Sequence, residues 1–362
     1  MPSGSTPVRL AVVGAGFIGR RHIEFLQKES RLSVVGAADD APEAGEWLAK
    51  RHIPHYTDYR KMLDELKPEG VIVGTPNQVH EEVTVACLER GIPVMVEKPI
   101  AHTLESAIAI CDAAKRTGVP VLVGHHRRHN PLMKAARACI DGGEIGRIVA
   151  IAAVDLRRKP DPYFNPAWRR TAGGGPLLIN GIHDIDCLRA LCGEIECVMA
   201  VTANRTRGFE VEDTAAITFT FSSGALGNLT LSDAVQGPWA WEITSGEEGE
   251  YPHVREDVYL ITGDQGSLAL PTLTHWRNER GGGRSDPFIR KQLFYVPADP
   301  WVEELVHFGA VARGEAVPLI TPDDGTRTLA ALLAVSRSAA LQRPIAVDDM
   351  FNPTKGNAGC HN

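Results

Sequence analysis

The chain lacks several features that mark whole classes of protein. Its 362 residues carry a formal net charge of −7, so it has no basic excess for binding nucleic acid. Aromatic residues make up only 6%, and they form no stacking platform for bases. No run of about 18 apolar residues occurs, and residues 1–10 contain no apolar stretch. We therefore expect no nucleic-acid partner, no membrane span and no signal peptide.

The seven cysteines are scattered and include no C-x-x-C pair. The spacing of Cys187, Cys192 and Cys197 does not match a zinc site, so we expect no metal. Reduced, mostly buried thiols and a cytoplasmic setting are the expectation. Hydrophobic residues make up 43% and charged residues 23%, as in ordinary globular enzymes, and the length favours two domains.

A glycine-rich turn after a short apolar strand is the most informative pattern present. Residues 8–13 run straight into Gly14-x-Gly16-x-x-Gly19, and a helical pattern follows. Glycine at these positions permits a tight turn, close approach of a pyrophosphate and packing of the helix on the strand. The phosphates would lie at a helix N-terminus, whose N–H groups favour negative charge. The predicted cofactor contacts in this turn are Gly14, Gly16, Phe17, Ile18 and Gly19.

A carboxylate ends the second apolar strand, 32–38. This residue, Asp39, follows Gly19 by about 20 residues, the spacing of a ribose-binding acid. Asp39 can accept hydrogen bonds from both ribose hydroxyls and would repel a 2′-phosphate, which favours NAD. Arg20 and Arg21 keep NADP open as the alternative. Asp39 can also be the N-cap of the following helix, and the two roles are compatible.

Strand and helix patterns alternate from residue 8 to about 124. Continuous apolar strands between helices predict a doubly wound parallel sheet covered on both faces. After residue 124, alternating segments joined by short turns predict an antiparallel sheet in a second α/β domain. The expected strands there are 147–156, 196–204, 213–221, 225–232, 239–245, 257–262, 266–270 and 291–296, and the expected helices are 131–141, 176–192, 299–313 and 322–341. The predicted division is 1–124 for dinucleotide binding, 125–350 for the second domain and 351–362 for a tail.

Two polar loops follow strands of the parallel sheet. Thr75-Pro76-Asn77 follows residues 71–74, with His80 three residues after Asn77. Because ligands bind beyond the carboxyl ends of parallel strands, this loop is expected to face the same crevice as the glycine turn. The alternatives are a rigid turn at Pro76 and a helix N-cap at Asn77.

Glu97-Lys98-Pro99 follows residues 93–96 in the same way. An ammonium held there can lower the pKa of a substrate hydroxyl and stabilise a developing alkoxide, and Glu97 can hold the lysine in position. The alternative for Lys98 is a solvated surface lysine.

A third constellation lies in the second domain. Gly173 to Gly175 and Pro176 mark a helix start, and Asn180, His183 and Asp186 fall near one face of that helix. A histidine titrates near neutrality, so His183 can take a proton from an alcohol as hydride leaves the carbon. Asp186 can orient the imidazole. The alternative is a buried histidine bonded to the backbone.

Candidate substrate contacts flank these motifs. Arg127 and Arg128 follow residues 119–123 among three histidines, and can read hydroxyls or a carboxylate. Trp168 and Arg169 precede the glycine run and can form a wall against a sugar ring. The alternatives are an exposed charged turn for the arginines and core packing for Trp168.

Together these motifs resemble the family of glucose–fructose oxidoreductase, inositol dehydrogenase and the rhizopine-catabolism protein MocA. The match covers about residues 8–347. It implies a Rossmann domain followed by an α/β domain with a large, mostly antiparallel sheet, which often makes homodimers or homotetramers. It further implies reversible oxidation of a secondary alcohol on a small-molecule sugar, polyol or cyclitol, with NAD or NADP.

The resemblance also implies roles for individual residues. Lys98 would be the essential lysine and His183 the catalytic histidine. The implied dinucleotide contacts are Gly14, Gly16, Gly19, Asp39, Thr75, Pro76, Asn77, His80, Glu97 and Lys98. The candidate substrate contacts are Lys98, Arg127, Trp168, Arg169, Asn180 and His183. Many relatives carry a carboxylate four residues before the histidine, whereas this chain has Ile179 there and Asn180 beside it. Because asparagine cannot accept a proton, the proton chemistry falls to His183 and Lys98.

The sequence therefore predicts an NAD-dependent dehydrogenase for a sugar, sugar derivative or cyclitol. Two alternatives stay open. One is an enzyme that cleaves glycosides or eliminates with a tightly bound, recycled NAD. The other is a non-catalytic NAD-binding regulator.

Overall fold

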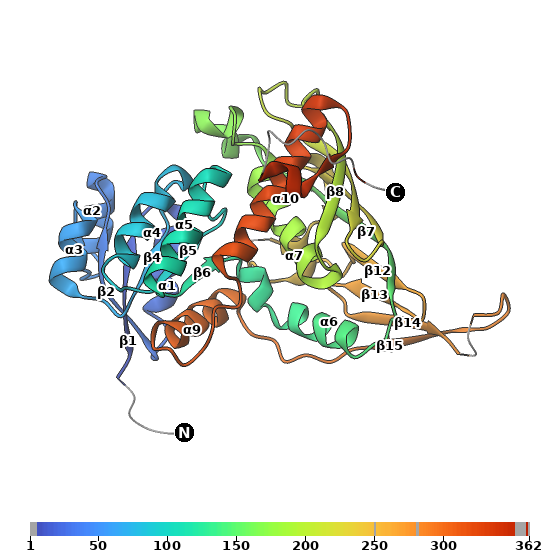
Figure 1. The fold of residues 1–362 in the computed structure, drawn as a ribbon, viewed down its shortest axis with the longest axis horizontal. Coiled ribbons are helices and arrows are strands. Elements are labelled where there is room, and N and C mark those ends of the chain that lie inside the picture. Colours follow the sequence, from blue (N-terminus) through green and yellow to red (C-terminus); the bar gives the residue numbers. More distant parts are fainter. Residues whose placement is uncertain (1–5, 250, 280–281, 352–359, 361–362) are drawn as a thin grey trace. The chain divides into compact units, whose positions relative to one another are not determined.

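The computed structural model describes residues 6–249, 251–279, 282–351 and 360 (Figure 1). The chain divides into two compact units. The first comprises the chain up to His129 together with Ala298–Leu329, and the second comprises Asn130–Pro297 with the chain from Ala330 onward. Residues 298–329 thus pack with the first unit, although they lie far along the chain. The continuous division predicted from the sequence remains a proposal.

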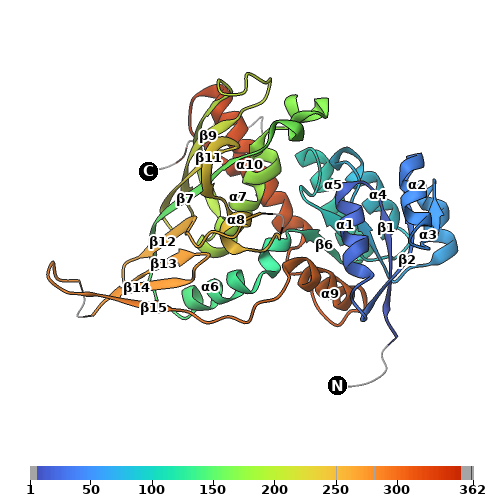
Figure 2. The same ribbon diagram turned by 180° about the vertical axis from the view of Figure 1, so that it is seen from behind.

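The first unit contains a six-stranded parallel sheet in the order β3-β2-β1-β4-β5-β6. Its strands are β1 Val8–Val13, β2 Leu32–Ala38, β3 His55–Tyr56, β4 Gly70–Val73, β5 Val94–Glu97 and β6 Val121–Gly124. Every residue of β4, β5 and β6 is buried, because helices cover both faces of the sheet (Figure 2). This confirms the doubly wound parallel sheet.

The helices of the first unit alternate with these strands. They are α1 Phe17–Leu26, α2 Pro42–Ala49, α3 Tyr59–Leu66, α4 His80–Leu88, α5 Leu104–Thr117 and α9 Pro300–Ala312, with short 3₁₀ turns η1 Asn77–Val79 and η2 His126–His129. Helix α9 packs against α1 and against η2. The late segment that carries α9 therefore completes the core of the first unit.

The second unit is built on a ten-stranded sheet in the order β15-β14-β13-β12-β7-β10-β9-β8-β16, with β11 paired to β7. Its strands are β7 Ile148–Arg158, β8 Ile195–Ala203, β9 Thr214–Phe221, β10 Leu226–Ser232, β11 Ala234–Trp239, β12 Tyr259–Gly263, β13 Ser267–Leu270, β14 Thr274–Asn278, β15 Phe288–Gln292 and β16 Ile345–Ala346. The pairing of β10 with β7 is parallel, and the other pairs are antiparallel. This confirms the large, mostly antiparallel sheet.

The helices that accompany this sheet are α6 Pro131–Asp141, α7 Ile182–Cys192, α8 Trp241–Ser245 and α10 Pro322–Leu341, the last of which contains the division at Leu329. The sequence predicted one continuous helix over 176–192. The structure instead begins with a π-helical turn, Leu177–Gly181, which runs directly into α7. Asn180 lies in the π turn and His183 in α7.

Two predicted strands are wrong or misplaced. Residues 239–245 were expected as a strand, but β11 ends at Trp239 and α8 begins at Trp241. Main-chain bonds from Ile243 and Thr244 back to Ala240 close a helical turn there, at 3.1 and 2.9 Å. The expected strand 291–296 overlaps only the end of β15. Its hairpin partner β14 was not predicted.

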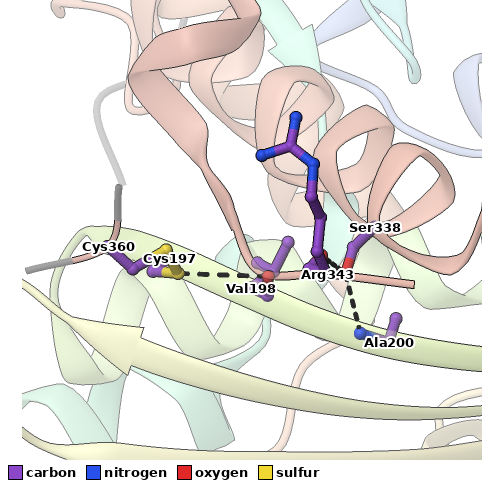
Figure 3. The surroundings of a disulfide bond; sticks show 6 residues. All are labelled: Cys197, Val198, Ala200, Ser338, Arg343 and Cys360. Carbon is purple, nitrogen blue, oxygen red and sulfur yellow. Dashed lines mark hydrogen bonds between the residues drawn. A yellow bond between two sulfur atoms is a disulfide. The ribbon is translucent and has the colours of Figure 1, made fainter. Parts of the chain in front are cut away.

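A disulfide joins Cys197 on β8 to Cys360, with Cα atoms 5.8 Å apart (Figure 3). The expectation of reduced thiols is therefore wrong for this pair. The two cysteines are 163 residues apart, so no local spacing reveals the bond. The free, buried cysteines are Cys87, Cys111, Cys139, Cys187 and Cys192. Of the predicted tail 351–362, only Phe351 and Cys360 belong to the described residues.

The described part of the chain contains neither a candidate membrane helix nor a candidate metal centre. No helix there is long and apolar enough to cross a bilayer. No group of three or more histidine, cysteine, aspartate or glutamate side chains is placed there to hold a metal ion.

Candidate functional site

The turn between β1 and α1 has the backbone that the glycine motif predicts. Gly14 has a φ of +89°, and a Cβ there would lie 2.7 Å from the carbonyl carbon of Gly74. A Cβ on Gly19 would collide with the carbonyl oxygen of Gly14. A Cβ on Gly16 would meet nothing within 4 Å. The outer side of the turn is therefore open at Gly16, where Phe17 is also 77% exposed.

Asp39 is bonded to this turn. Its Oδ2 accepts the N–H of Ala15 at 2.6 Å, and its Oδ1 accepts the N–H of Ala41 at 2.9 Å. The N-cap residue of α2 is Ala41, so the interpretation of Asp39 as the N-cap is wrong. The carboxylate instead ties the glycine turn to the end of β2, where the predicted ribose contact belongs.

His80 links the loops that follow β4 and β5. It is 1% exposed, with Nδ1 3.0 Å from the carbonyl oxygen of Pro99 and Nε2 3.0 Å from that of Thr75. Burial lowers the pKa of His80, although both carbonyls oppose this shift. The N-cap of α4 is Val79, so the N-cap interpretation of Asn77 is wrong. His80 therefore links the two loops through their main-chain carbonyls.

Glu97 anchors the main chain at Lys98. The Glu97 carboxylate is 3% exposed; its Oε1 lies 2.7 Å from Nε2 of the fully buried His22, and its Oε2 accepts the Lys98 N–H at 3.1 Å. Burial raises the pKa of Glu97, but the His22 hydrogen bond and nearby positive charges outweigh burial, so the pKa is lowered. Lys98 itself is half-buried, and its peptide bond to Pro99 is cis.

Further buried polar residues, among them His126 and Glu304, lie near Glu97. His126 stacks on Trp301 of α9 with ring centroids 4.0 Å apart, and Nδ1 of His129 lies 3.8 Å from Oε1 of Glu304. Burial, with the charge of Glu97, raises the pKa of Glu304 well above its usual range. Arg127 is 1% exposed, so the interpretation of this segment as an exposed charged turn is wrong. Sequence reasoning gave neither Glu304 nor Trp301 a role at this site, because nothing local links α9 to β5.

In the second unit, the start of the π turn is fixed by a half-buried acid. A Cβ on Gly175 would collide with Glu212, whose Oε1 accepts the N–H of Leu177 at 3.0 Å. Burial raises the pKa of Glu212. The turn and α7 then carry Asn180 and His183, which are 8% and 6% exposed. Asp186, further along α7, is 1% exposed.

Lys159 contacts Asn180 and was missed by the sequence analysis. Its Nζ lies 2.5 Å from Asn180 Oδ1 and 4.0 Å from Asp233 Oδ2. Burial lowers the pKa of Lys159 to about 8, although Asp233 opposes the shift. A signal was available: Lys159-Pro160 follows β7 just as Lys98-Pro99 follows β5.

Arg169 lies beside the aromatic ring of Tyr163, which Lys159 also approaches. Its guanidinium carbon is 3.7 Å from the centroid of Tyr163 and 5.2 Å from that of Trp168. Trp168 is 55% exposed, so core packing is the wrong interpretation of this side chain. Trp168 and Arg169 thus lie side by side within the second unit, and their contact with a sugar ring remains a prediction.

The structure therefore holds two sets of functional side chains, each within its own unit. The first unit carries a glycine turn, an aspartate and an anchored lysine at the carboxyl ends of parallel strands. Such an edge binds phosphates and a nicotinamide in open α/β sheets. The second unit carries a histidine with donors beside it, which suits proton transfer and recognition of hydroxyl or carboxylate groups.

Comparison with protein families gives matches over most of the chain. Residues 8–125 match "Oxidoreductase family, NAD-binding Rossmann fold". Residues 133–269 match "GFO/IDH/MocA C-terminal domain".

Individual relatives are distant. The chain is 28% identical over 352 residues to scyllo-inositol 2-dehydrogenase (NAD(+)) of Bacillus subtilis, covering 94% of this chain and 96% of the relative. It is 29% identical over 202 residues to rhizopine catabolism protein MocA of Rhizobium meliloti, covering 56% of this chain and only 62% of that relative. A solved oxidoreductase from Agrobacterium radiobacter, in complex with NAD+, L-tartaric acid and magnesium, has a TM-score of 0.80. At 18% identity over 95% of this chain and all of that one, it shows likeness of fold alone.

Proposed function

The chain belongs to the GFO/IDH/MocA oxidoreductase family, whose Rossmann domain binds NAD, and we propose that it is an NAD-dependent dehydrogenase of a sugar, sugar derivative or cyclitol. The observation that carries this proposal is the anchored Lys98. A buried carboxylate holds its main chain at the end of β5, in the sheet whose β1–α1 turn has the dinucleotide-binding glycines. The likeness to scyllo-inositol 2-dehydrogenase supports the substrate class.

We propose that Gly14, Gly16, Phe17, Ile18, Gly19, Asp39, Thr75, Pro76, Asn77, His80, Glu97 and Lys98 form the cofactor half of the site. The residues present fit a dinucleotide, because the turn is open at Gly16 and Asp39 lies at its edge. His80 acts there by holding the loops of Thr75 and Pro99, since both its ring nitrogens face main-chain carbonyls. A bound NAD would supply the hydride acceptor. Asp39 favours NAD over NADP, because a 2′-phosphate would meet its negative charge.

The proton chemistry is assigned to two side chains. His183 takes the proton of the substrate hydroxyl, and the Lys98 ammonium stabilises the oxygen as negative charge develops on it. Asn180 donates to the substrate, and Arg127, Trp168 and Arg169 are the further contacts proposed from the sequence. Asn180 cannot replace a carboxylate as a base.

A homodimer or homotetramer is also proposed. Large apolar side chains lie on one exposed face of the ten-stranded sheet. They include Met199, Val201, Leu226 and Leu260, which are 45%, 65%, 57% and 47% exposed. An apolar face of this kind marks an interaction surface, and a second copy of the chain would cover it.

The test is a screen of aldoses, inositols, sugar acids and glycosides for NADH absorbance, with NAD and NADP in parallel. We expect NADH to accumulate with a polyol, and Lys98→Met or His183→Ala to lower kcat by at least about 10² while NAD still binds. An unchanged kcat in His183→Ala would remove this mechanism. Product formed without net NADH would favour the recycled-cofactor alternative.

A further inference from the structure

Three buried charges alternate along the end of β7 and the residue that follows it. Asp155, Arg157 and Lys159 alternate with more exposed neighbours and are 1%, 3% and 6% exposed. Arg157 is saturated by two carboxylates, because Asp155 and Glu242 lie 2.7 and 2.6 Å from its guanidinium nitrogens. Its charge is therefore compensated within the protein.

Lys159 is compensated less directly. Its short contact is the 2.5 Å hydrogen bond to Asn180 Oδ1, which carries no formal charge. The carboxylate paired with it, Asp233, is 4.0 Å away and accepts the Arg207 Nε–H at 2.9 Å. A buried ammonium is costly without a close counter-charge. An anion brought to Lys159 Nζ would supply one.

Main-chain hydrogen bonds hold Lys159 in position, and its ammonium determines the orientation of the Asn180 amide. Its N–H donates to the Asp233 carbonyl at 2.9 Å, and its carbonyl accepts from Arg207 Nη2 at 3.0 Å. Because an ammonium can only donate, the amide oxygen of Asn180 faces Lys159 and the amide Nδ2 is left to donate elsewhere. Asn180 lies three residues before His183 in one continuous helical segment, so the partner of Lys159 is about one turn from the proposed catalytic histidine.

A second cation shares the same aromatic ring. Lys159 Nζ is 4.6 Å and the Arg169 guanidinium carbon 3.7 Å from the centroid of Tyr163. The hydrogen bond of Arg169 Nη1, at 2.6 Å, goes to the Tyr163 carbonyl, again a neutral group. Two cations around one ring, each bonded to a neutral oxygen, suit a ligand with a carboxylate.

We propose that Lys159 and Arg169 form a carboxylate-binding subsite beside Asn180 and His183, so that the substrate is a polyhydroxy acid such as an aldonic or uronic acid. This deepens the proposed dehydrogenase function and rests on it. The carboxylate binds at the cations, while a hydroxyl of the same molecule meets His183. A neutral sugar would leave the ammonium with the neutral oxygens of Asn180 and Tyr163 and with the Asp233 carboxylate 4.0 Å away.

The experiment compares acids with matched neutral compounds in the full-length protein. The pairs are D-gluconate with D-glucitol, D-galactonate with D-galactitol, and D-glucuronate with D-glucose. NADH formation gives kcat/KM, and calorimetry in the presence of NAD gives binding. At least one acid is expected to exceed its neutral partner about tenfold or more in kcat/KM, the contribution of a charge-assisted hydrogen bond.

Lys159→Met and Arg169→Met should each lower that acid-to-neutral ratio about tenfold. Arg169 is half-buried in the short 3₁₀ turn Ala167–Arg170, so its variant keeps the test valid if Lys159→Met fails to fold. Arg158→Met is the matched control, because the Arg158 side chain is 44% exposed and pairs with the exposed Asp161. It should leave the ratio unchanged.

Each outcome decides the matter. NADH formation from neutral polyols alone overturns the subsite but leaves the dehydrogenase. Lys159-dependent binding of an acid without NADH formation supports the subsite and removes the proposed function. Equal losses for acid and neutral substrates in both variants, or no binding of any acid, overturn the subsite.

Discussion

Replacing His22 by alanine should destabilise the first unit strongly, because it removes the partner of a buried carboxylate. His22 is 0% and Glu97 3% exposed, and their Nε2 and Oε1 atoms lie 2.7 Å apart. Removing one member of such a pair typically costs about 3–5 kcal/mol. The edge contact of His22 with Trp301, at 5.6 Å between ring centroids, is lost as well. We expect the free energy of unfolding to fall by at least about 3 kcal/mol.

A second substitution separates the charge from the cavity. Glu97→Gln keeps an oxygen to accept the Lys98 N–H and removes the buried charge, so alone it should cost only about 1–2 kcal/mol. In the His22→Ala background the cavity is unchanged, and Glu97→Gln should therefore restore about 1–2 kcal/mol. Urea unfolding of the four proteins at pH 7 measures this. A double variant that loses the sum of both single losses would refute the reasoning.

The same pair sets an acid dependence. The folded-state pKa of Glu97 is lowered below the ordinary 4.5, so the folded state binds fewer protons than the unfolded state across that range. The contribution of ionised Glu97 to the free energy of unfolding is therefore fully present above pH 4.5, and it is lost as pH falls through the lower pKa that Glu97 has in the folded state. The gap in stability between wild type and Glu97→Gln should narrow there.

Further predictions concern the cofactor, one lysine and the disulfide. Asp39→Ala removes the acceptor of the Ala15 and Ala41 N–H groups and the charge that would face a 2′-phosphate. NADH binding should therefore weaken about tenfold or more, while the affinity for NADPH rises relative to that for NADH. Fluorescence titrations that give an unchanged ratio of the two dissociation constants would contradict this. The folded pKa of Lys159 is about 8 against an ordinary 10.5, so the unfolded state binds more protons between these values. Burying the charged lysine should therefore lower the free energy of unfolding by about 3 kcal/mol below pH 8, and this loss should fade as pH rises to 10.5. Unfolding of wild type and Lys159→Met is compared from pH 7 to 10. A difference in stability that stays constant over this range would contradict the prediction. The disulfide closes a loop over a sequence separation of 163, for which chain entropy stabilises the folded state by at most about 5 kcal/mol. Reductant and Cys360→Ser should therefore lower the Tm by similar amounts. An unchanged Tm in both would argue against the bond.

The features that sequence predicted well are those with local spacing. The glycine turn, Asp39 and the strand ends at Thr75 and Glu97 follow from strand–helix alternation, because each is fixed by neighbours within one βαβ unit. Hydrophobic runs were enough to identify the parallel sheet, since its central strands are buried on both faces.

The missed features depend on packing between distant segments. His22 meets Glu97 across 75 residues, and Lys159 meets Asn180 across 21. Periodicity indicates which face of an element is buried but not which element covers it. For the same reason the return of α9 to the first unit and the Cys197–Cys360 bond were not predicted. The strand expected at 239–245 failed because main-chain bonds to Ala240 close a helical turn instead.

The central claim is that Lys98 and His183 serve one hydride-transfer step on one hydroxyl group. The most direct measurement is kcat for NADH formation by wild type, Lys98→Met, His183→Ala and the double variant on the best substrate of the screen. Because residues that act as a unit are non-additive, the double variant should be about as slow as the slower single variant, each single variant losing at least about 10². Losses that multiply in the double variant, or a single variant with unchanged kcat, would contradict the claim.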